Sequence, residues 1–583
     1  MYIRQLTVHH FRGFSNLMIK PKRHVVLMGE PGAGRSDVIN AISRVLDSNV
    51  IRTGTTTELD FHQRNVAEPI EIEVTIGGLG ADLEQHFLDY LEVWNLETDQ
   101  LLEECEAPED VNGENQEWVL RLAYRGQWLI EQERCEEWIY YPKHSDSASQ
   151  SFRRISLTDI ERLGFSHLSY DSGKILDLGT RGTFRKIVEQ SSGGDFAAAL
   201  AQYVQEVADA AARFTTSNQV KLALGEVITS LHEILRIQPT DISQHVEFSP
   251  EGGSPSGLLR SLGPTIDLGG GGGVLPAWRQ GSTIGALFRL AESLALSAGS
   301  ENIVAIDDLG NGMDSASATH FGAIIRSTAG QAWITTRLPS VAEIFEPVEV
   351  IRLGRALDGT RFAYQGSTPT TKSEAIAAKH WHRNLLPVFS YHSVIVVEGP
   401  HDLSTLHALA IRLCNEGGKY LPATYSIAII SAGATGSGGY SSVLRLTAAA
   451  KEMGLYAVGL VDGDTSPGVK EFVESHSDNA DVVIRLPDSV AIEYAIVNDV
   501  PDSAIRQALS DTAAALQIPP IQRLDEIPVK ELKDQTITYI KRNMLHAAFI
   551  EALPFENLPP LANTILAKAV LAAREQLTGF IQL

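Results

Sequence analysis

Two acidic clusters in the last third of the chain have residue types and spacings that suit metal-dependent phosphate chemistry. Glu398 and Asp402 follow one short apolar run, and Asp462 and Asp464 follow a second. Carboxylates at the ends of buried strands are costly unless a cation meets them. All-oxygen ligands suit Mg²⁺ or Mn²⁺, so the clusters predict a divalent-metal site.

A glycine loop near the N-terminus predicts a nucleotide site. Gly29, Gly32 and Gly34 precede Arg35 and Ser36 in the layout of a phosphate-binding loop, with arginine where lysine is expected. Glycines let backbone N–H groups approach phosphates, and the start of the following helix adds a favourable field. The Ser36 hydroxyl suits a magnesium ion, so we expect ATP with Mg²⁺ here.

A second pair of acids fits the same nucleotide site. Asp307 and Asp308 end the apolar run 302–306. In ATPases of the phosphate-loop type, an acid in the first position holds Mg²⁺ and one in the second polarises the attacking water. Two aspartates that cap a turn before Gly310 and Gly312 are the alternative interpretation.

The elements that must position these residues alternate between strands and helices. The runs 24–28 and 302–306 predict strands beside a helix that follows the glycine loop, and the runs 394–397, 426–430, 456–461 and 482–486 predict a second, parallel sheet. The alanine-rich segment 195–237 has helical periodicity and predicts a hairpin, either a covering layer or a dimerisation surface. The fold class is therefore α/β.

Composition limits the class of protein. A chain of 583 residues needs several domains, and its net charge of -24 is unusual for a nucleic-acid-binding protein. Much of that charge lies in 81–120, which contains no Lys or Arg and is expected to be a solvated face or loop. Three separated cysteines argue against zinc or disulfides, and we expect a cytoplasmic protein without a signal peptide or membrane span.

The N-terminal part resembles the ABC-type ATPase heads of the RecF, SMC and OLD (overcoming lysogenization defect) families. The segment 11–14 is similar to the end of their first strand, Ser282 and Gly285 lie in a stretch similar to their signature loop, and Asp314 matches their D-loop. Arg337 stands where these proteins place a switch histidine. The resemblance implies that these residues contact nucleotide.

Three departures from the family pattern predict slow ATP hydrolysis. Arg35 replaces a lysine, Asp308 replaces a glutamate and Arg337 replaces a histidine. Arginine is planar and bulkier than lysine, and aspartate is one methylene shorter than glutamate. We therefore expect nucleotide binding that gates another activity more than it drives a motor.

The C-terminal part resembles a Toprim domain, in which a glutamate and a DxD pair follow successive parallel strands. The resemblance implies that Glu398 and Asp462 are catalytic and that Glu398, Asp402, Asp462 and Asp464 bind metal. One ion would be held by Glu398, Asp462 and Asp464.

Two further residues match OLD-type Toprim domains. Glu493 falls where they have an additional metal-binding glutamate, which with Asp402 would hold a second ion, and Lys541 matches a lysine near the scissile phosphate. The helix that carries Lys541 is expected to run from 535 to 552. A helix N-terminal acid and an exposed helix lysine are the alternatives, with Lys533 and Lys530 as other candidates for the lysine.

The order of these parts is similar to the OLD family, which includes the nuclease subunit of the Gabija defence system. It implies an ATPase domain over 1–190 and 241–371 with an acidic insertion at about 79–120, a helical dimerisation insertion over 191–240, and a Toprim domain over 372–583. The implied function is an oligomeric, ATP-regulated DNA endonuclease in anti-phage defence. A helicase-like subunit is a further expected partner.

Two other functions remain open at this stage. One is a topoisomerase or primase, although the cysteines form no zinc domain and no tyrosine is marked as a nucleophile. The other is a non-catalytic DNA-repair clamp of the RecF kind, in which ATP drives dimerisation on DNA.

Overall fold

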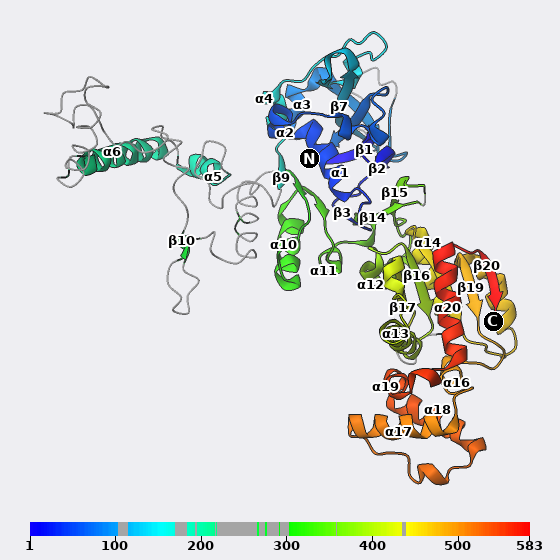
Figure 1. Ribbon diagram of the computed structural model, residues 1–583. Helices are drawn as coiled ribbons and strands as arrows, with labels where there is room; N and C mark the ends of the chain where they lie inside the picture. The colour runs from blue at the N-terminus through cyan, green and yellow to red at the C-terminus, as the bar shows by residue number, and fades with distance from the viewer. Residues whose placement is uncertain are drawn as a thin grey trace. The chain divides into compact units, whose positions relative to one another are not determined.

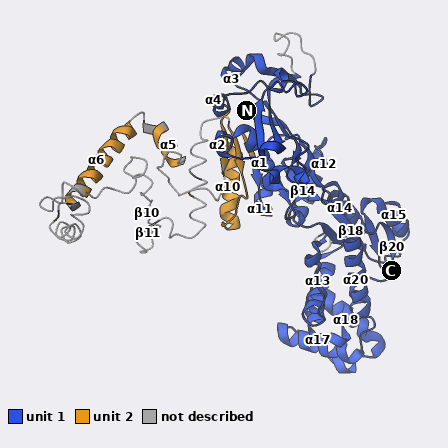
Figure 2. Cartoon of the chain, turned by 45° about the horizontal axis from the view of Figure 1, so that its top comes forward, with its two compact units in different colours: residues 1–161, 333–583 blue, residues 162–332 orange. Residues whose placement is uncertain are grey.

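The computed structural model describes residues 1–102, 115–168, 183–192, 195–215, 217, 265–266, 275–276, 288, 291, 302–356, 358–433 and 439–583. The chain divides into two compact units (Figure 2). The larger unit contains Met1–Glu161 and Trp333–Leu583, and the smaller unit contains Arg162–Ala332. The domain borders expected from the sequence differ from this division and stay predictions.

The larger unit begins with an antiparallel sheet in the strand order β2-β1-β4-β7-β5-β6, and β8 also pairs with β7. Ile3, Leu6 and Val8 are fully buried on one face of β1. Strand residues alternate between the two faces, and a register shift between Ile3 and Gln5 brings Ile3 to the same face as Leu6 and Val8. The strands are β1 (Tyr2–Phe11), β2 (Phe14–Ile19), β4 (Ile70–Gly77), β5 (Leu91–Asn95), β6 (Gln100–Leu101), β7 (Gln116–Leu129) and β8 (Arg134–Tyr140).

A second group of strands carries the glycine loop. Strand β3 (Val25–Gly29) pairs in parallel with β13 (Gln331–Thr335) and β14 (Val350–Arg355), and β15 (Arg361–Gln365) lies antiparallel to β14. Every residue of β3 is buried, as expected for a parallel strand covered on both faces. Helix α1 (Arg35–Leu46) follows and contacts β1, β3, β4 and β7. The predicted order of strand, glycine loop and helix is confirmed.

Part of the acidic stretch, expected to be a solvated face or loop, is folded into the first sheet, whereas Asp82, Asp89 and Glu97 are exposed. Trp94 and Val119 are buried on β5 and β7. Glu117 accepts hydrogen bonds from Tyr2 and Arg4, and Glu92 pairs with Arg121 at 2.9 Å. Glu92 and Glu117 therefore pair with arginines that lie outside the stretch 81–120, on other strands or further along the chain.

The expected second parallel sheet is present in the C-terminal part, in the order β17-β16-β18-β19-β20 (Figure 1). Its strands are β16 (Ser393–Val397), β17 (Ile427–Ser431), β18 (Tyr456–Val461), β19 (Val482–Arg485) and β20 (Gly579–Gln582). Apolar side chains of β16, β18 and β19 form one core with those of helices α13, α17, α19 and α20.

Helices surround this sheet and extend from one end of it, where α17, α18 and α19 gather (Figure 1). The helices are α12 (Lys372–Leu385), α13 (Pro400–Asn415), α14 (Tyr440–Glu452), α15 (Val469–Ser475), α16 (Ile492–Ala495), α17 (Asp502–Leu516), α18 (Val529–Asn543), α19 (His546–Ala552) and α20 (Pro560–Glu575). The single helix expected over 535–552 is wrong. Met544 adopts a left-handed conformation (φ 56°) that ends α18, and α19 starts after it.

One buried arginine joins the N-terminal strands to the C-terminal part inside the larger unit. Arg352 of β14 is 1% exposed and donates hydrogen bonds to four carbonyl oxygens of the C-terminal part. The acceptors are those of Phe389, Tyr391, Met453 and Gly454, at 2.8–3.3 Å. Burial of the guanidinium lowers the pKa of Arg352 to about 10, with Glu30 opposing that shift.

In the smaller unit, β9 (Phe165–Leu168) and β12 (Ile303–Ile306) pair in parallel. The helices described within this unit are α5 (Thr183–Ser192), α6 (Asp195–Thr215) and α10 (Ser315–Thr328). Helix α6 covers the first half of the expected helical hairpin, and nearly all of its second half lies outside the described residues. No helix in the described part of the chain is long and apolar enough to cross a membrane.

Candidate active site

The parallel C-terminal sheet brings three of the predicted carboxylates to one edge. Glu398 directly follows β16, Asp462 directly follows the neighbouring strand β18, and Asp402 lies in the first turn of α13. The carboxyl ends of parallel strands lie at the same edge of a sheet, where ligands usually bind. Glu398 Oε1 accepts a hydrogen bond from the Asp462 backbone N–H at 2.9 Å, which fixes the two segments together.

Burial and mutual repulsion disfavour the charged forms of these acids. Desolvation, followed by the charges of Glu398, Asp402 and Glu493, raises the pKa of Asp462 to about 8. Desolvation likewise raises the pKa of Asp402 to about 7, although its Oδ2 accepts a hydrogen bond from Gly399 N–H at 2.8 Å. The pKa of Glu398 is also raised, mainly by desolvation. Such a concentration of negative charge favours a bound cation.

The additional glutamate lies beside the predicted lysine. Glu493, in the short helix α16, is buried, and Lys541 Nζ of α18 lies 3.0 Å from its Oε1. Burial opposes ionisation of Glu493, but a hydrogen bond from its own backbone and the ammonium of Lys541 lower its pKa below the usual value. The structure thus brings Glu493 and Lys541 together from segments 48 residues apart.

Asp464 is oriented differently from the other acids. Its side chain is exposed, and its Oδ1 accepts hydrogen bonds from the backbone N–H and hydroxyl of Ser466 at 2.8 and 2.7 Å. Its charge still contributes to the raised pKa of Glu398. The Asp464 carboxylate therefore lies close enough to influence Glu398, but it is hydrogen-bonded to Ser466 in the turn that follows β18.

A close backbone contact positions the loop that carries Asp462. The Gly463 N–H donates to Val490 O, and Ser489 N–H donates to Gly463 O, at 2.8 and 2.7 Å. A Cβ at residue 463 would lie 1.7 Å from Pro487 O, so only glycine fits between the two aspartates. Arg485, which is buried, donates to Asp464 O at 2.8 Å and braces the same loop.

The donor set fits a divalent metal in its chemistry, since it consists of carboxylate oxygens. Within the described residues, however, no group of three His, Cys, Asp or Glu side chains has the geometry to hold a metal ion. A cation would therefore have to draw the carboxylates together.

The glycine loop has the backbone expected of a phosphate-binding loop. Gly29, Gly32 and Gly34 all have positive φ, and a Cβ at residue 29 would lie 2.1 Å from Leu353 O. Arg35 Nη1 donates to Thr336 O at 2.9 Å, so the arginine also holds the end of β13. Ser36 lies in the first turn of α1.

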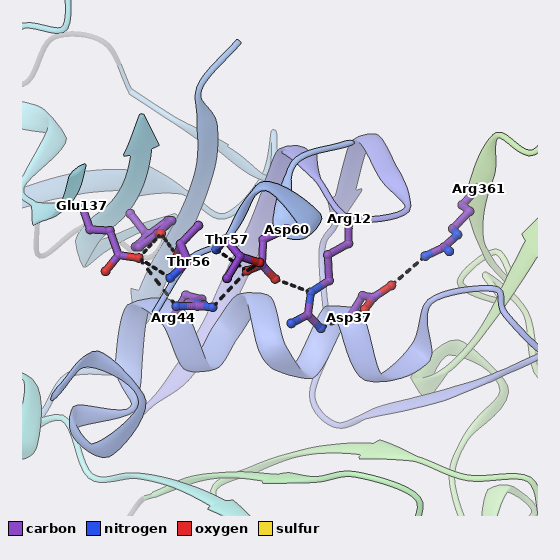
Figure 3. A network of polar contacts seen from close by, with 9 residues as sticks. Arg12, Asp37, Arg44, Thr56, Thr57, Asp60, Glu137 and Arg361 are labelled. Atoms are coloured by element: carbon purple, nitrogen blue, oxygen red, sulfur yellow. Dashed lines mark hydrogen bonds and ion pairs between the residues drawn. The ribbon is translucent and has the colours of Figure 1, made fainter. Parts of the chain in front are cut away.

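Two arginines that the sequence analysis did not single out lie beside this loop. Arg12 Nη1 and Arg361 Nη1 contact the two carboxylate oxygens of Asp37, at 3.1 and 2.7 Å, in the first turn of α1 (Figure 3). Arg12 also pairs with Asp60 at 2.9 Å. Arg12 stands within the segment 11–14 that matched the family pattern, whereas Arg361 has no local signal because it comes from a distant strand.

The remaining predicted nucleotide residues are only partly described. Asp307 and Asp308 follow β12 in the smaller unit, and Asp308 has a φ of 56° in a turn where its carbonyl accepts from Asn311 N–H. Asp314 caps α10 by accepting from Ser317 N–H at 2.9 Å. Arg337 follows β13 in the larger unit and is exposed. Ser282 and Gly285 lie outside the described residues.

Comparison with known proteins gives one family match. Residues 1–76 match the family described as "Protein of unknown function (DUF2813)". No curated protein matches the chain.

Solved structures give remote alignments. The SMC head domain from Thermotoga maritima aligns over 63% of this chain and 100% of its own, with 12% identity and a TM-score of 0.27. The RecF-ATP structure aligns over 57% of this chain and 91% of its own, with 10% identity and a TM-score of 0.26. The C-terminal region of the Burkholderia pseudomallei OLD protein aligns over 31% of this chain and 98% of its own, with 13% identity and a TM-score of 0.22. Scores of this size do not establish a shared fold.

Proposed function

We propose that the protein is a divalent-metal-dependent DNA endonuclease of the OLD type, regulated by ATP. The main supporting observation is the set of mutually repelling carboxylates at the carboxyl edge of a parallel sheet, with Asp402 buried and Glu398 and Asp462 half-buried. The adjacent Glu493–Lys541 pair supplies a further acid and a cation that faces solvent. This combination suits hydrolysis of a phosphodiester better than transfer of a neutral group.

We assign a separate role in this reaction to each of these residues. Glu398, Asp462 and Asp464 are proposed to hold one ion, and Asp402 and Glu493 a second, with Mg²⁺ or Mn²⁺ as the metal. When bound, such ions generate hydroxide and stabilise the leaving oxygen. Lys541 is proposed to offset the negative charge that develops on the phosphorus.

The glycine loop is proposed to bind ATP with Mg²⁺ and to control cleavage more than to power it. Arg35 already donates a hydrogen bond to Thr336 O, and its planar guanidinium is not interchangeable with the lysine ammonium that the phosphate-loop pattern has at this position. The resemblance to ABC-type heads also supports a homodimer or larger oligomer, and the resemblance to the OLD family, including the Gabija nuclease, supports a role in anti-phage defence beside a helicase-like subunit.

A plasmid-nicking assay tests the proposal. We expect the wild-type protein to nick or cut DNA with Mg²⁺ or Mn²⁺, and both Glu398→Gln and Asp462→Asn to reduce the rate by at least about 100-fold. Glu556→Gln, at an exposed glutamate of the same part of the chain, is the matched control. Runs with and without ATP show whether the nucleotide inhibits or stimulates cleavage.

The same assay decides against the alternatives. A protein that binds DNA in an ATP-dependent way but cleaves none, with both variants indistinguishable from wild type, would support the RecF-like clamp. Relaxation of supercoiled DNA without free ends would support a topoisomerase, and synthesis of short primers a primase.

A further inference from the structure

A histidine beside the proposed nuclease centre is buried without hydrogen-bond partners. His546 begins α19 and is 0% exposed. Neither of its ring nitrogens has a hydrogen-bond partner among the described residues. A buried polar atom without a partner destabilises a folded protein, so such groups are rare unless they serve a function.

The ring is held in place by a second histidine. His401 stacks on His546 with ring centroids 4.3 Å apart and planes at 27°. His401 belongs to the first turn of α13, next to Asp402 and close to Glu398. The stack therefore joins α19 to the segment that carries two of the proposed metal ligands.

Lys541 and His546 both have a side-chain nitrogen near the same carboxylate oxygen of Glu493. Lys541 Nζ lies 3.0 Å from Glu493 Oε1, whereas His546 Nε2 lies 4.0 Å from it, beyond hydrogen-bond distance. The Lys541 side chain is 61% exposed and the Glu493 side chain only 9%. The exposed Lys541 side chain can therefore rotate away from Glu493 toward a ligand, whereas the buried His546 side chain remains beside Glu493.

We propose that His546 is a positioning residue that takes over Glu493 when Lys541 moves to a substrate phosphate. Its Nε2–H then donates to Glu493 Oε1, and stacking on His401 fixes the direction of that donor. This inference rests on the proposed nuclease function and adds to it an exchange of partners at Glu493. The shift needed is about 1 Å, within the range of a side-chain rotation, given hydrogen-bond distances of about 3 Å.

A double-mutant cycle on the full-length protein tests the exchange without using cleavage. Mn²⁺ affinity, measured calorimetrically without DNA, should change by less than about threefold in His546→Phe, because Lys541 still orients Glu493. In a Lys541→Ala background the same His546→Phe change should weaken Mn²⁺ binding about tenfold, the range found for residues that orient metal ligands. Phenylalanine keeps the ring and the stack but has no N–H.

Two further variants distinguish the effect of the His546 N–H donor from the effect of its packing. His546→Gln carries an amide N–H near the position of Nε2 and should restore most of the Mn²⁺ affinity in the Lys541→Ala background. His407→Gln, at an exposed histidine of α13, should have no effect. Circular dichroism checks each variant, and if His546→Phe does not fold, His546→Met provides the same comparison.

The outcomes are distinct. Equal Mn²⁺ affinity of Lys541→Ala with and without His546→Phe would overturn the exchange, as would a His546→Gln variant no better than His546→Phe. A wild-type protein that binds no Mn²⁺ and cleaves no DNA would instead overturn the proposed function itself, and this inference with it.

Discussion

At the scale of single residues, the pKa of Asp462 links protonation to stability. In the metal-free protein it is raised to about 8 by burial first and by the neighbouring acids second. An unfolded chain has an aspartate pKa of about 3.9, so between about pH 4 and pH 8 the folded state binds more protons than the unfolded state. The free energy of unfolding contributed by this group therefore falls as pH rises through that window.

We accordingly predict that Asp462→Asn, measured in EDTA by urea unfolding, is less sensitive to pH than wild type between pH 5 and pH 8. The variant should be the more stable of the two at pH 8, where part of the wild-type protein carries an ionised, half-buried Asp462 beside other acids. Asp402 keeps part of the pH dependence, since its pKa is raised to about 7. Identical pH dependence of the two proteins would show that Asp462 is not desolvated as described.

A second residue-scale prediction concerns Arg35 in the glycine loop. Arg35→Ala should weaken ATP binding by roughly tenfold, because it removes a cation at the phosphate-binding loop and releases the end of β13. Equilibrium binding of a fluorescent ATP analogue measures the change. Arg52→Ala is the control, since Arg52 is exposed and pairs with Glu161. Unchanged affinity in Arg35→Ala would argue that the loop does not bind nucleotide.

Local sequence patterns predicted some of the site residues but not others. Glu398, Asp402 and Asp462 were found because each follows a buried run within the same few residues. His546 and Arg485 were missed, because a lone histidine in a helix or arginine in a strand has no signal until its neighbours are known. The orientation of Asp464 was likewise decided by Ser466, two residues on.

At the scale of elements, Gly463 shows how two loops position the acids. Gly463→Ala would place a methyl group 1.7 Å from Pro487 O, so the loop after β18 or the loop after β19 must move. We predict a loss of about 1–3 kcal/mol in the free energy of unfolding and at least about tenfold weaker Mn²⁺ binding. Chemical denaturation and calorimetry measure the two effects.

The matched control is Gly80→Ala, whose Cβ would meet nothing within 4 Å. It should leave both Mn²⁺ affinity and stability nearly unchanged. If Gly463→Ala behaved like this control, the loop would be free to adjust and would not position Asp462.

At the scale of the whole molecule, Arg352 holds the glycine-loop strands to the C-terminal part of the larger unit. The guanidinium satisfies four backbone carbonyl oxygens on that part. Glu30, within the glycine loop, accepts from Arg355 N–H at 2.7 Å and lies 3.9 Å from His392, directly before β16. A short path of contacts therefore connects the glycine loop with β16, the strand that Glu398 follows.

Arg352→Met should lower the free energy of unfolding by at least about 2 kcal/mol, because it leaves buried carbonyl oxygens without donors. It should also reduce the effect of ATP on DNA cleavage while ATP still binds. Urea unfolding and the nicking assay with and without ATP measure these effects. Arg523→Met, at an exposed arginine paired with Glu526, is the control. Full retention of the ATP effect would exclude this junction as the coupling path.

The sequence by itself predicted the strand, glycine loop and helix near the N-terminus, the C-terminal parallel strands and most of the proposed site residues. Continuous apolar runs specify buried parallel strands, and glycines or acids directly after them mark the edge where ligands bind, because both signals depend only on residues close in the chain. The tertiary structure alone decided which distant side chains meet. The pairing of Glu92 and Glu117 with arginines, the end of α18 at Met544 and the contacts among Glu493, Lys541, His546 and His401 depend on strand pairing and helix packing. No local pattern contains these.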